Sequence, residues 1–149
     1  MGLFVVEGDL LSGEYQTIAH QCNCISKNGG GLYLDVIEKY PQTDVYSTRK
    51  RPSIPGTIMF INPVILMFSQ YYPSGPREES FGFDTKEERE CWFKQCLDAI
   101  PELGISEIAF PYKIGCGLAQ GKWRKYKTMI KIFAKTNPDI DVYIVKKVD

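Results

Sequence analysis

The sequence lacks an excess of charge of either sign, and it lacks any long apolar run. Eighteen Lys and Arg residues balance eighteen Asp and Glu residues, so the formal net charge is zero. These totals predict no basic stripe for nucleic-acid phosphates and no charged disordered tail, so nucleic acid is not an expected partner. No apolar run approaches the roughly 18 residues of a membrane-spanning helix, and no secretory signal pattern opens the chain. We therefore expect a cytoplasmic protein with no membrane partner.

Metal-binding residues are also scarce. His20 is the only histidine, and no Cys-x-x-Cys pair occurs among the five cysteines, which are Cys22, Cys24, Cys91, Cys96 and Cys116. A zinc site of four cysteines, or of two cysteines and two histidines, is therefore not expected. We predict neither a metal nor another cofactor. Free, buried thiols in a reducing compartment are the simplest interpretation of the cysteines.

What is present fits one domain spanning residues 1–149, with 44% hydrophobic residues and enough chain to bury a core. Apolar patterns predict strands at 3–7, 17–22, 57–61, 64–70, 105–110 and 141–145. Helices are expected at 32–40, after the capping pair Thr85 and Glu88, and in a last segment lined by Trp123, Tyr126, Ile130 and Phe133. Segment 42–55 has no assignable pattern. The alternation predicts an α/β fold with a mixed sheet between helices.

Two glycine-bearing loops each follow a predicted strand and precede a predicted helix. The first contains Asn28-Gly29-Gly30-Gly31, and the second is Ile114-Gly115-Cys116-Gly117-Leu118-Ala119-Gln120-Gly121. Glycine lets a backbone approach a ligand closely, and the free amides of a helix N-terminus attract anions. Neither loop is a Walker A or a GxGxxG motif. Together they favour a diphosphate clamp, and ordinary turns are the alternative.

A few side chains near these loops could carry chemistry. His20 ends a predicted strand three residues before Asn23, where it could act on a phosphate ester as nucleophile or general acid/base, although a lone histidine is often structural. Asp9 follows the first strand and could accept a hydrogen bond from an exocyclic amine, or could form an Asx turn. Cys22 would share a strand face with His20, which leaves a thiol nucleophile as a weaker alternative. Four carboxylates are interpreted as helix-surface or capping residues: Asp35, Glu38, Asp84 and Glu88.

Five motifs, in this order, carry a resemblance to a known family. They are Ile18-Ala19-His20-Gln21-Cys22-Asn23-Cys24, Gly29-Gly30-Gly31, Glu38-Lys39-Tyr40-Pro41, Met67-Phe68-Ser69-Gln70-Tyr71 and Pro111-Tyr112-Lys113-Ile114-Gly115-Cys116-Gly117-Leu118. From Gly8-Asp9-Leu10 to the last strand, the chain resembles a macro domain. The similar branches are the ADP-ribose-1''-phosphate phosphatases of yeast and phage type and the terminal ADP-ribose glycohydrolases. This resemblance implies a three-layer α/β/α sandwich with a mixed central sheet.

The resemblance also implies roles for individual residues. Asp9, with the Leu10 backbone N–H, would bind adenine, and Asn23 would hold the distal ribose. The first loop would be Gly29, Gly30 and Gly31, and the second diphosphate loop would be Ile114, Gly115, Cys116, Gly117, Leu118 and Ala119. Gln70 and Tyr71 would border the distal ribose. Tyr143, near the end of the last strand, would contact adenine, with Val145 as the alternative. His20 would be catalytic.

Three departures from the family pattern refine the implied activity. The family's hydrolases that remove ADP-ribose from glutamate use a Lys near the position of Tyr71 and an Asp at the position of Ala119. Neither is present, so that covalent lysine route is not expected. Tyr33 stands where a smaller Ala is common, so the packing beneath the first loop should differ. The presence of His20 favours a phosphatase.

The function expected from the sequence is therefore hydrolysis of ADP-ribose-1''-phosphate to ADP-ribose and phosphate, in a phage- or microbe-like protein. A non-catalytic module that binds ADP-ribose is one alternative. A hydrolase that removes ADP-ribose from modified macromolecules is another. An unrelated thiol enzyme using Cys22 or Cys116 is the last.

Overall fold

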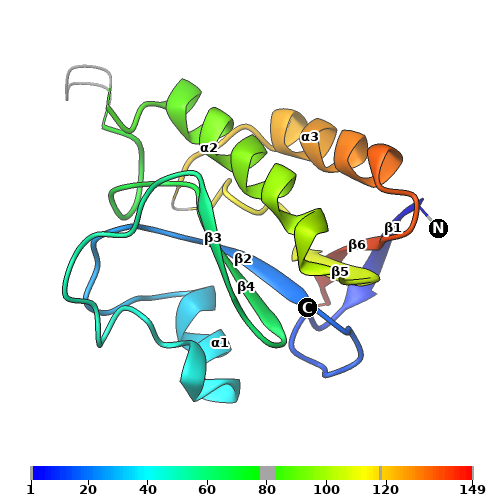
Figure 1. Ribbon diagram of the computed structural model, residues 1–149, viewed down its shortest axis with the longest axis horizontal. Helices are drawn as coiled ribbons and strands as arrows, with labels where there is room; N and C mark the ends of the chain where they lie inside the picture. Colours follow the sequence, from blue (N-terminus) through cyan, green and yellow to red (C-terminus); the bar gives the residue numbers. More distant parts are fainter. Residues whose placement is uncertain (1, 78–82, 118, 149) are drawn as a thin grey trace.

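The computed structural model describes residues 2–77, 83–117 and 119–148, and Figure 1 shows their arrangement. The strands are β1 (Gly2–Gly8), β2 (Ile18–Cys22), β3 (Thr57–Ile61), β4 (Val64–Phe68), β5 (Glu107–Pro111) and β6 (Asp141–Lys147). The α-helices are α1 (Leu32–Lys39), α2 (Lys86–Ala99) and α3 (Trp123–Thr136), with 3-10 turns η1 (Pro41–Thr43) and η2 (Ile100–Leu103). The predicted order of strands and α-helices is confirmed.

The strands form one six-stranded mixed sheet in the order β1-β6-β5-β2-β4-β3. Neighbouring strands are parallel throughout, except for β3, which runs antiparallel to β4. Helix α1 covers one face of the sheet, whereas α2 and α3 cover the other face (Figure 1). The predicted three-layer α/β/α sandwich is therefore confirmed.

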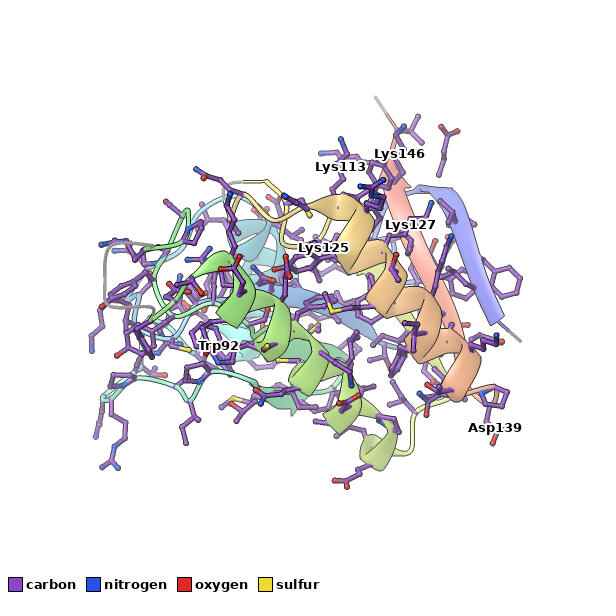
Figure 2. All side chains as sticks on the ribbon, turned by 90° about the horizontal axis from the view of Figure 1, so that it is seen from above. Trp92, Lys113, Lys125, Lys127, Asp139 and Lys146 are labelled. Carbon is purple, nitrogen blue, oxygen red and sulfur yellow. The ribbon has the colours of Figure 1, made fainter. Side chains whose placement is uncertain are left out.

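Each face of the sheet has its own core, because alternate residues of a strand point to opposite faces. In β4, Ile65 and Met67 pack in the cluster with α2 and α3, whereas Leu66 and Phe68 pack in the cluster with α1. The whole of β4 is buried, as expected for an interior strand covered by helices on both faces. Seen from above, α2 and α3 lie side by side across the sheet (Figure 2).

The N-termini of α1 and α2 differ in how they are capped. Helix α2 begins where predicted, because the Thr85 hydroxyl oxygen accepts a hydrogen bond from the Glu88 N–H at 3.1 Å. Helix α1 begins after Gly31, which supplies no side-chain cap. Segment 42–55, which had no prediction, forms the end of η1 and a series of turns that bury Tyr46. No described helix has the length and apolar character needed to cross a membrane.

Candidate functional site

A cavity of about 700 Å³ lies at the carboxyl ends of β2 and β5, which are neighbours in the sheet. It is lined by residues of both glycine loops and of three other segments: His20, Gln21, Asn23, Ser26, Asn28, Gly29, Gly30, Gly31, Leu32, Tyr33, Tyr46, Gln70, Pro73, Ser74, Pro111, Tyr112, Lys113, Ile114, Gly115, Gly117 and Ala119. The carboxyl edge of a parallel sheet is where ligands of open α/β folds bind. The structure thus brings the two predicted loops together.

The described residues that line the cavity carry charge of one sign, which is positive. Lys113 is the only charged residue among the described residues that line the cavity, and no Asp or Glu is among them. The ammonium groups of Lys113 and Lys146 lie 5.6 and 5.2 Å from the centroid of the Tyr112 ring, and Figure 2 shows the two lysines together. With a cation at the rim and no carboxylate in the lining, the cavity favours an anionic ligand.

The first glycine loop rests on a stacked pair of tyrosines. The rings of Tyr33 and Tyr46 are 3.9 Å apart and nearly parallel, and the Tyr33 hydroxyl donates to Asp44 at 2.7 Å. A Cβ on Gly29 would lie 2.4 Å from the Tyr33 ring, so only glycine fits there. Gly31 has φ of 55° and directs the chain into α1. The bulk of Tyr33 beneath the first loop is thus packed against Tyr46.

Asn23 is 8% exposed and holds the start of this loop. Its side-chain oxygen accepts hydrogen bonds from the N–H groups of Ile25 at 3.1 Å and Ser26 at 2.8 Å. Its backbone N–H donates to the Tyr46 hydroxyl at 2.7 Å. Asn23 lines the cavity, but its Oδ1 atom is already used within the loop.

The second glycine loop is closed by its own backbone. The Gly121 N–H donates to the Gly115 carbonyl at 2.8 Å, and the Cys116 N–H donates to the Lys113 carbonyl at 2.9 Å. Gly115 has φ of 77°. A Cβ there would meet the Tyr126 ring at 2.7 Å and the Gln21 side chain at 2.8 Å. Leu118, which was predicted to bind ligand, lies outside the described residues.

His20 lies on the α1 face of β2 and lines the cavity, although its side chain is only 2% exposed. Its ring nitrogens are 3.7 and 3.9 Å from Cys22 Sγ. Burial lowers the pKa of His20 to about 4, because the charged imidazolium loses its hydration. The imidazole is therefore neutral at pH 7, which suits a nucleophile and does not suit a general acid.

The thiol alternatives receive no support from this geometry. Burial raises the pKa of Cys22 to about 12 and that of Cys116 to about 11. A reactive cysteine needs a thiolate at neutral pH, and both groups would be protonated there. The expectation that all five thiols are buried is wrong for Cys91, which is exposed, and for Cys116, which is half-buried.

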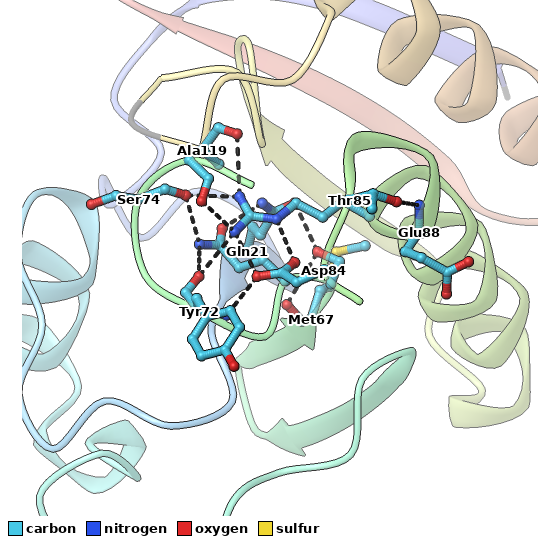
Figure 3. Close-up of polar contacts among 12 residues, drawn as sticks. Gln21, Met67, Tyr72, Ser74, Asp84, Thr85, Glu88 and Ala119 are labelled. Carbon is cyan, nitrogen blue, oxygen red and sulfur yellow. Dashed lines mark hydrogen bonds and ion pairs between the residues drawn. The ribbon is translucent and has the colours of Figure 1, made fainter. Parts of the chain in front are cut away.

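Gln70 lines the cavity, but its side-chain amide is engaged by other groups of the protein. It accepts from Gln21 Nε2 at 2.6 Å and donates to the Tyr72 carbonyl at 2.8 Å. The Ser69 hydroxyl donates to the other end of the Gln21 amide at 2.7 Å. Figure 3 includes this chain of contacts around Gln21. Gln70 thus braces the wall of the cavity.

Five described residues with predicted ligand roles are not among those lining the cavity: Asp9, Leu10, Tyr71, Cys116 and Tyr143. Asp9 is exposed at the end of β1, and its side chain accepts from the Leu11 N–H at 2.9 Å, which is the Asx turn considered above. Leu10 is buried against the α1 face. Tyr71 packs edge-on against Tyr72 and Phe83.

The predicted position of Tyr143 near the end of the last strand is wrong. Strand β6 continues to Lys147, so Tyr143 is its third residue. Its ring stacks on Phe4 with centroids 5.1 Å apart and contacts Tyr15. The alternative, Val145, lies closer to the carboxyl end of the strand and is 4% exposed.

Sequence reasoning missed several residues of the site. Tyr46 lies in the segment without a prediction, and Tyr112 belongs to a family motif but has no predicted role, although both line the cavity. The prediction that Asp84 is a helix-surface or capping residue is wrong, because Asp84 is fully buried beside the cavity wall in an ion pair with Arg89 at 2.7 Å. The available signal was the position of Arg89, which lies on the same helix face as Trp92, Phe93, Cys96 and Leu97.

The depressed pKa of His20 predicts a pH-dependent stability. Unfolding restores the ordinary value of 6.5, so the unfolded chain binds more protons between pH 6.5 and about 4. Stability from this group is complete above pH 6.5 and is lost as the pH falls toward 4, by about 3 kcal/mol in total. Urea unfolding of the wild type should show this loss, and His20→Asn should lack that part of it.

An NMR titration gives an independent check, because the chain has one histidine and its ring signals are unambiguous. A ring pKa close to 6.5 in the folded protein would contradict the prediction.

The second loop predicts a contrast between two glycines. Gly115→Ala should lower the free energy of unfolding by about 2 kcal/mol, because alanine resists a positive φ and its Cβ would meet Tyr126 and Gln21. Gly117→Ala is the matched control, since no described residue other than its chain neighbours lies within 4 Å of its Cβ position. Urea denaturation would measure both, and equal effects would contradict the described backbone.

No protein-family model and no curated protein matches the chain. Solved structures do match it. The macrodomain of Mycobacterium tuberculosis DarG is 16% identical, with 100% of both chains covered and a TM-score of 0.74. The macrodomain of Thermus aquaticus DarG is 18% identical, with 96% of this chain and 97% of that chain covered and a TM-score of 0.73.

A third similar structure is Thermosipho africanus DarTG, which was solved in complex with ADP-ribose. It is 19% identical and has a TM-score of 0.69, with 98% of this chain and 42% of that chain covered. These likenesses are structural, because the identities are low. The chain has the macrodomain fold.

Proposed function

We propose that the cavity binds ADP-ribose and that the protein hydrolyses ADP-ribose-1''-phosphate to ADP-ribose and phosphate. The observation that carries the binding proposal is the lining: two glycine loops and the start of α1 surround a space with one cation and, among the described residues, no carboxylate. Backbone amides and an uncapped helix start suit a diphosphate. The similar Thermosipho africanus DarTG, solved with ADP-ribose, supports the same ligand class.

The ligand would extend along the carboxyl edge of the sheet. The distal ribose and the diphosphate would occupy the cavity between Gly29–Gly31 and Gly115–Ala119. Asn23 Oδ1 is used within the loop, so Asn23 Nδ2, which donates to no described residue, would be the atom that binds ligand. Asp9 lies at the same edge, at the end of β1. Three strand spacings separate β1 from β2 in the sheet order, or about 14 Å. Asp9 and the Leu10 N–H would therefore meet the adenine outside the cavity.

His20 would supply the chemistry. A lone pair on its neutral imidazole would attack the phosphorus of the 1''-phosphate, and the bond from phosphorus to the ribose 1'' oxygen would break. ADP-ribose would leave with the electron pair of that bond, taking a proton from water, and a second water would then hydrolyse the phosphohistidine to free phosphate. Loop amides would stabilise the charge on the transferring phosphoryl group. The low pKa supports this nucleophilic role, because no deprotonation is needed at pH 7.

One observation favours a second candidate, a module that binds ADP-ribose without hydrolysing it. The His20 side chain is 2% exposed, so little of its ring surface faces the cavity in the ligand-free protein. Nucleophilic attack needs a reacting nitrogen within about 3.5 Å of phosphorus. Ligand binding would have to expose that nitrogen for the phosphatase to work.

The deciding experiment titrates the wild type and His20→Asn with ADP-ribose by calorimetry and then follows phosphate release from ADP-ribose-1''-phosphate. We expect both proteins to bind ADP-ribose with similar affinity, because His20 is at the reacting end. Phosphate release should fall at least about a hundredfold in the variant.

Binding without release by the wild type would establish the binding module instead. Release that is unchanged in His20→Asn would remove His20 from the mechanism. Absence of ADP-ribose binding would contradict both candidates.

A further inference from the structure

Arg89 is a buried cation outside the cavity for which the proposed chemistry has no use. It is the fourth residue of α2, and its side chain is only 2% exposed. Its Nε atom donates to Asp84 Oδ1 at 2.7 Å, and its Nη2 atom donates to Asp84 Oδ2 at 2.9 Å. This two-point pairing fixes the plane of the guanidinium.

The remaining contacts of the guanidinium go to backbone carbonyls of two separate loops. Nη1 donates to the carbonyl of Ser74 at 2.7 Å and to that of Ala119 at 3.2 Å. Nη2 donates to the carbonyls of Tyr72 at 3.1 Å and Gly75 at 3.0 Å. Figure 3 shows these dashed contacts converging between Ser74, Ala119, Tyr72 and Asp84.

Both loops form walls of the cavity. Pro73 and Ser74 line it from one loop, and Gly117 and Ala119 line it from the other. One guanidinium nitrogen, Nη1, therefore connects lining residues that are 45 positions apart in the sequence.

Asp84 and Gln70 complete the connection. Asp84 Oδ2 accepts from the Tyr72 N–H at 2.8 Å, and the Asp84 carbonyl accepts from the Arg77 N–H at 2.8 Å. Gln70 Nε2 donates to the Tyr72 carbonyl at 2.8 Å from inside the cavity wall. Residues 72–75 belong to none of the described strands. Side chains hold this loop instead: Arg89 and Asp84 from one side and Gln70 from the other.

We propose that Arg89 is a positioning residue for the ligand site, which sets the separation of the Ser74 and Ala119 walls without touching the ligand. Only a planar fork with several donors can pair with a carboxylate and serve four carbonyls together. Lysine keeps the charge and loses the fork. In the lysine variant both walls would be less ordered, so a ligand that contacts both would have to order them on binding and would bind with lower affinity.

The test compares Arg89→Lys with Ile130→Ala, a variant in α3. Ile130 is fully buried in the core and does not line the cavity, so its truncation lowers the melting temperature by several degrees without altering the walls. Both variants are measured well below their melting temperatures. We expect the dissociation constant for ADP-ribose to rise about tenfold or more in Arg89→Lys and to stay within about twofold in Ile130→Ala.

Hydrogen exchange of the ligand-free proteins supplies a second readout. The hydrogen-bonded amides of Tyr72, Arg77, Gln120 and Gly121 should exchange faster in Arg89→Lys and at the wild-type rate in Ile130→Ala, under conditions where local opening governs exchange. The inference rests on the proposed function only for the affinity measurement with ADP-ribose, and the exchange measurement does not depend on it. A wild type that fails to bind ADP-ribose would overturn that function and leave the exchange arm intact.

Two results would overturn the positioning role itself. One is unchanged exchange in both loops of Arg89→Lys. The other is a loss of affinity in Arg89→Lys no larger than that in Ile130→Ala, which would show that Arg89 acts only through global stability.

Discussion

The parallel placement of β2 beside β5 is the constraint on which the site depends. Their register aligns Ile18 with Ala109, and the Ala109 N–H donates to the Thr17 carbonyl at 2.9 Å. Because the two strands run the same way, both end at one edge of the sheet, and both glycine loops must leave from that edge. Segments about ninety residues apart in the sequence therefore face each other. On its other edge β2 pairs in parallel with β4, which is fully buried, and this pairing anchors β2 in the core.

Desolvation has a different consequence for each group around the cavity. It keeps His20 neutral and Cys22 protonated, because for Cys22 the loss of hydration outweighs the opposing effects of the Tyr46 hydroxyl and the Arg49 charge on the thiol pKa. Among the described lining residues, charge is confined to Lys113 at the rim, and the interior offers amide, hydroxyl and backbone groups. Such a surface distinguishes ligands by the position of their hydrogen-bonding groups. Tyr33 and Tyr46 provide the rigid support that keeps the first loop in position.

Sequence patterns predicted the elements whose structure depends on interactions between residues close in the chain. The apolar run of β4, the cap at Thr85 and the two glycine loops were all predictable, because burial, capping and positive φ act within a few residues. The end of β6 was not predictable in this way. Lys146 and Lys147 are polar, but they belong to the strand because they pair with Glu7 and Gly8 of β1. Tyr46 was missed because its segment has no periodicity. Asp84 was misread because its partner's burial depends on loops distant in the sequence.

The Arg89–Asp84 pair is better explained by geometry than by stability. A buried ion pair offers little net stability over apolar residues of the same size, because two charges lose their hydration. Backbone carbonyls in an irregular loop must nevertheless find donors once they are buried. Residues 72–75 and 119–121 belong to none of the described strands, so no strand pairing supplies these donors. A guanidinium is the one side chain with enough donors for both loops. The contacts that satisfy these carbonyls therefore also set the width of the cavity between them.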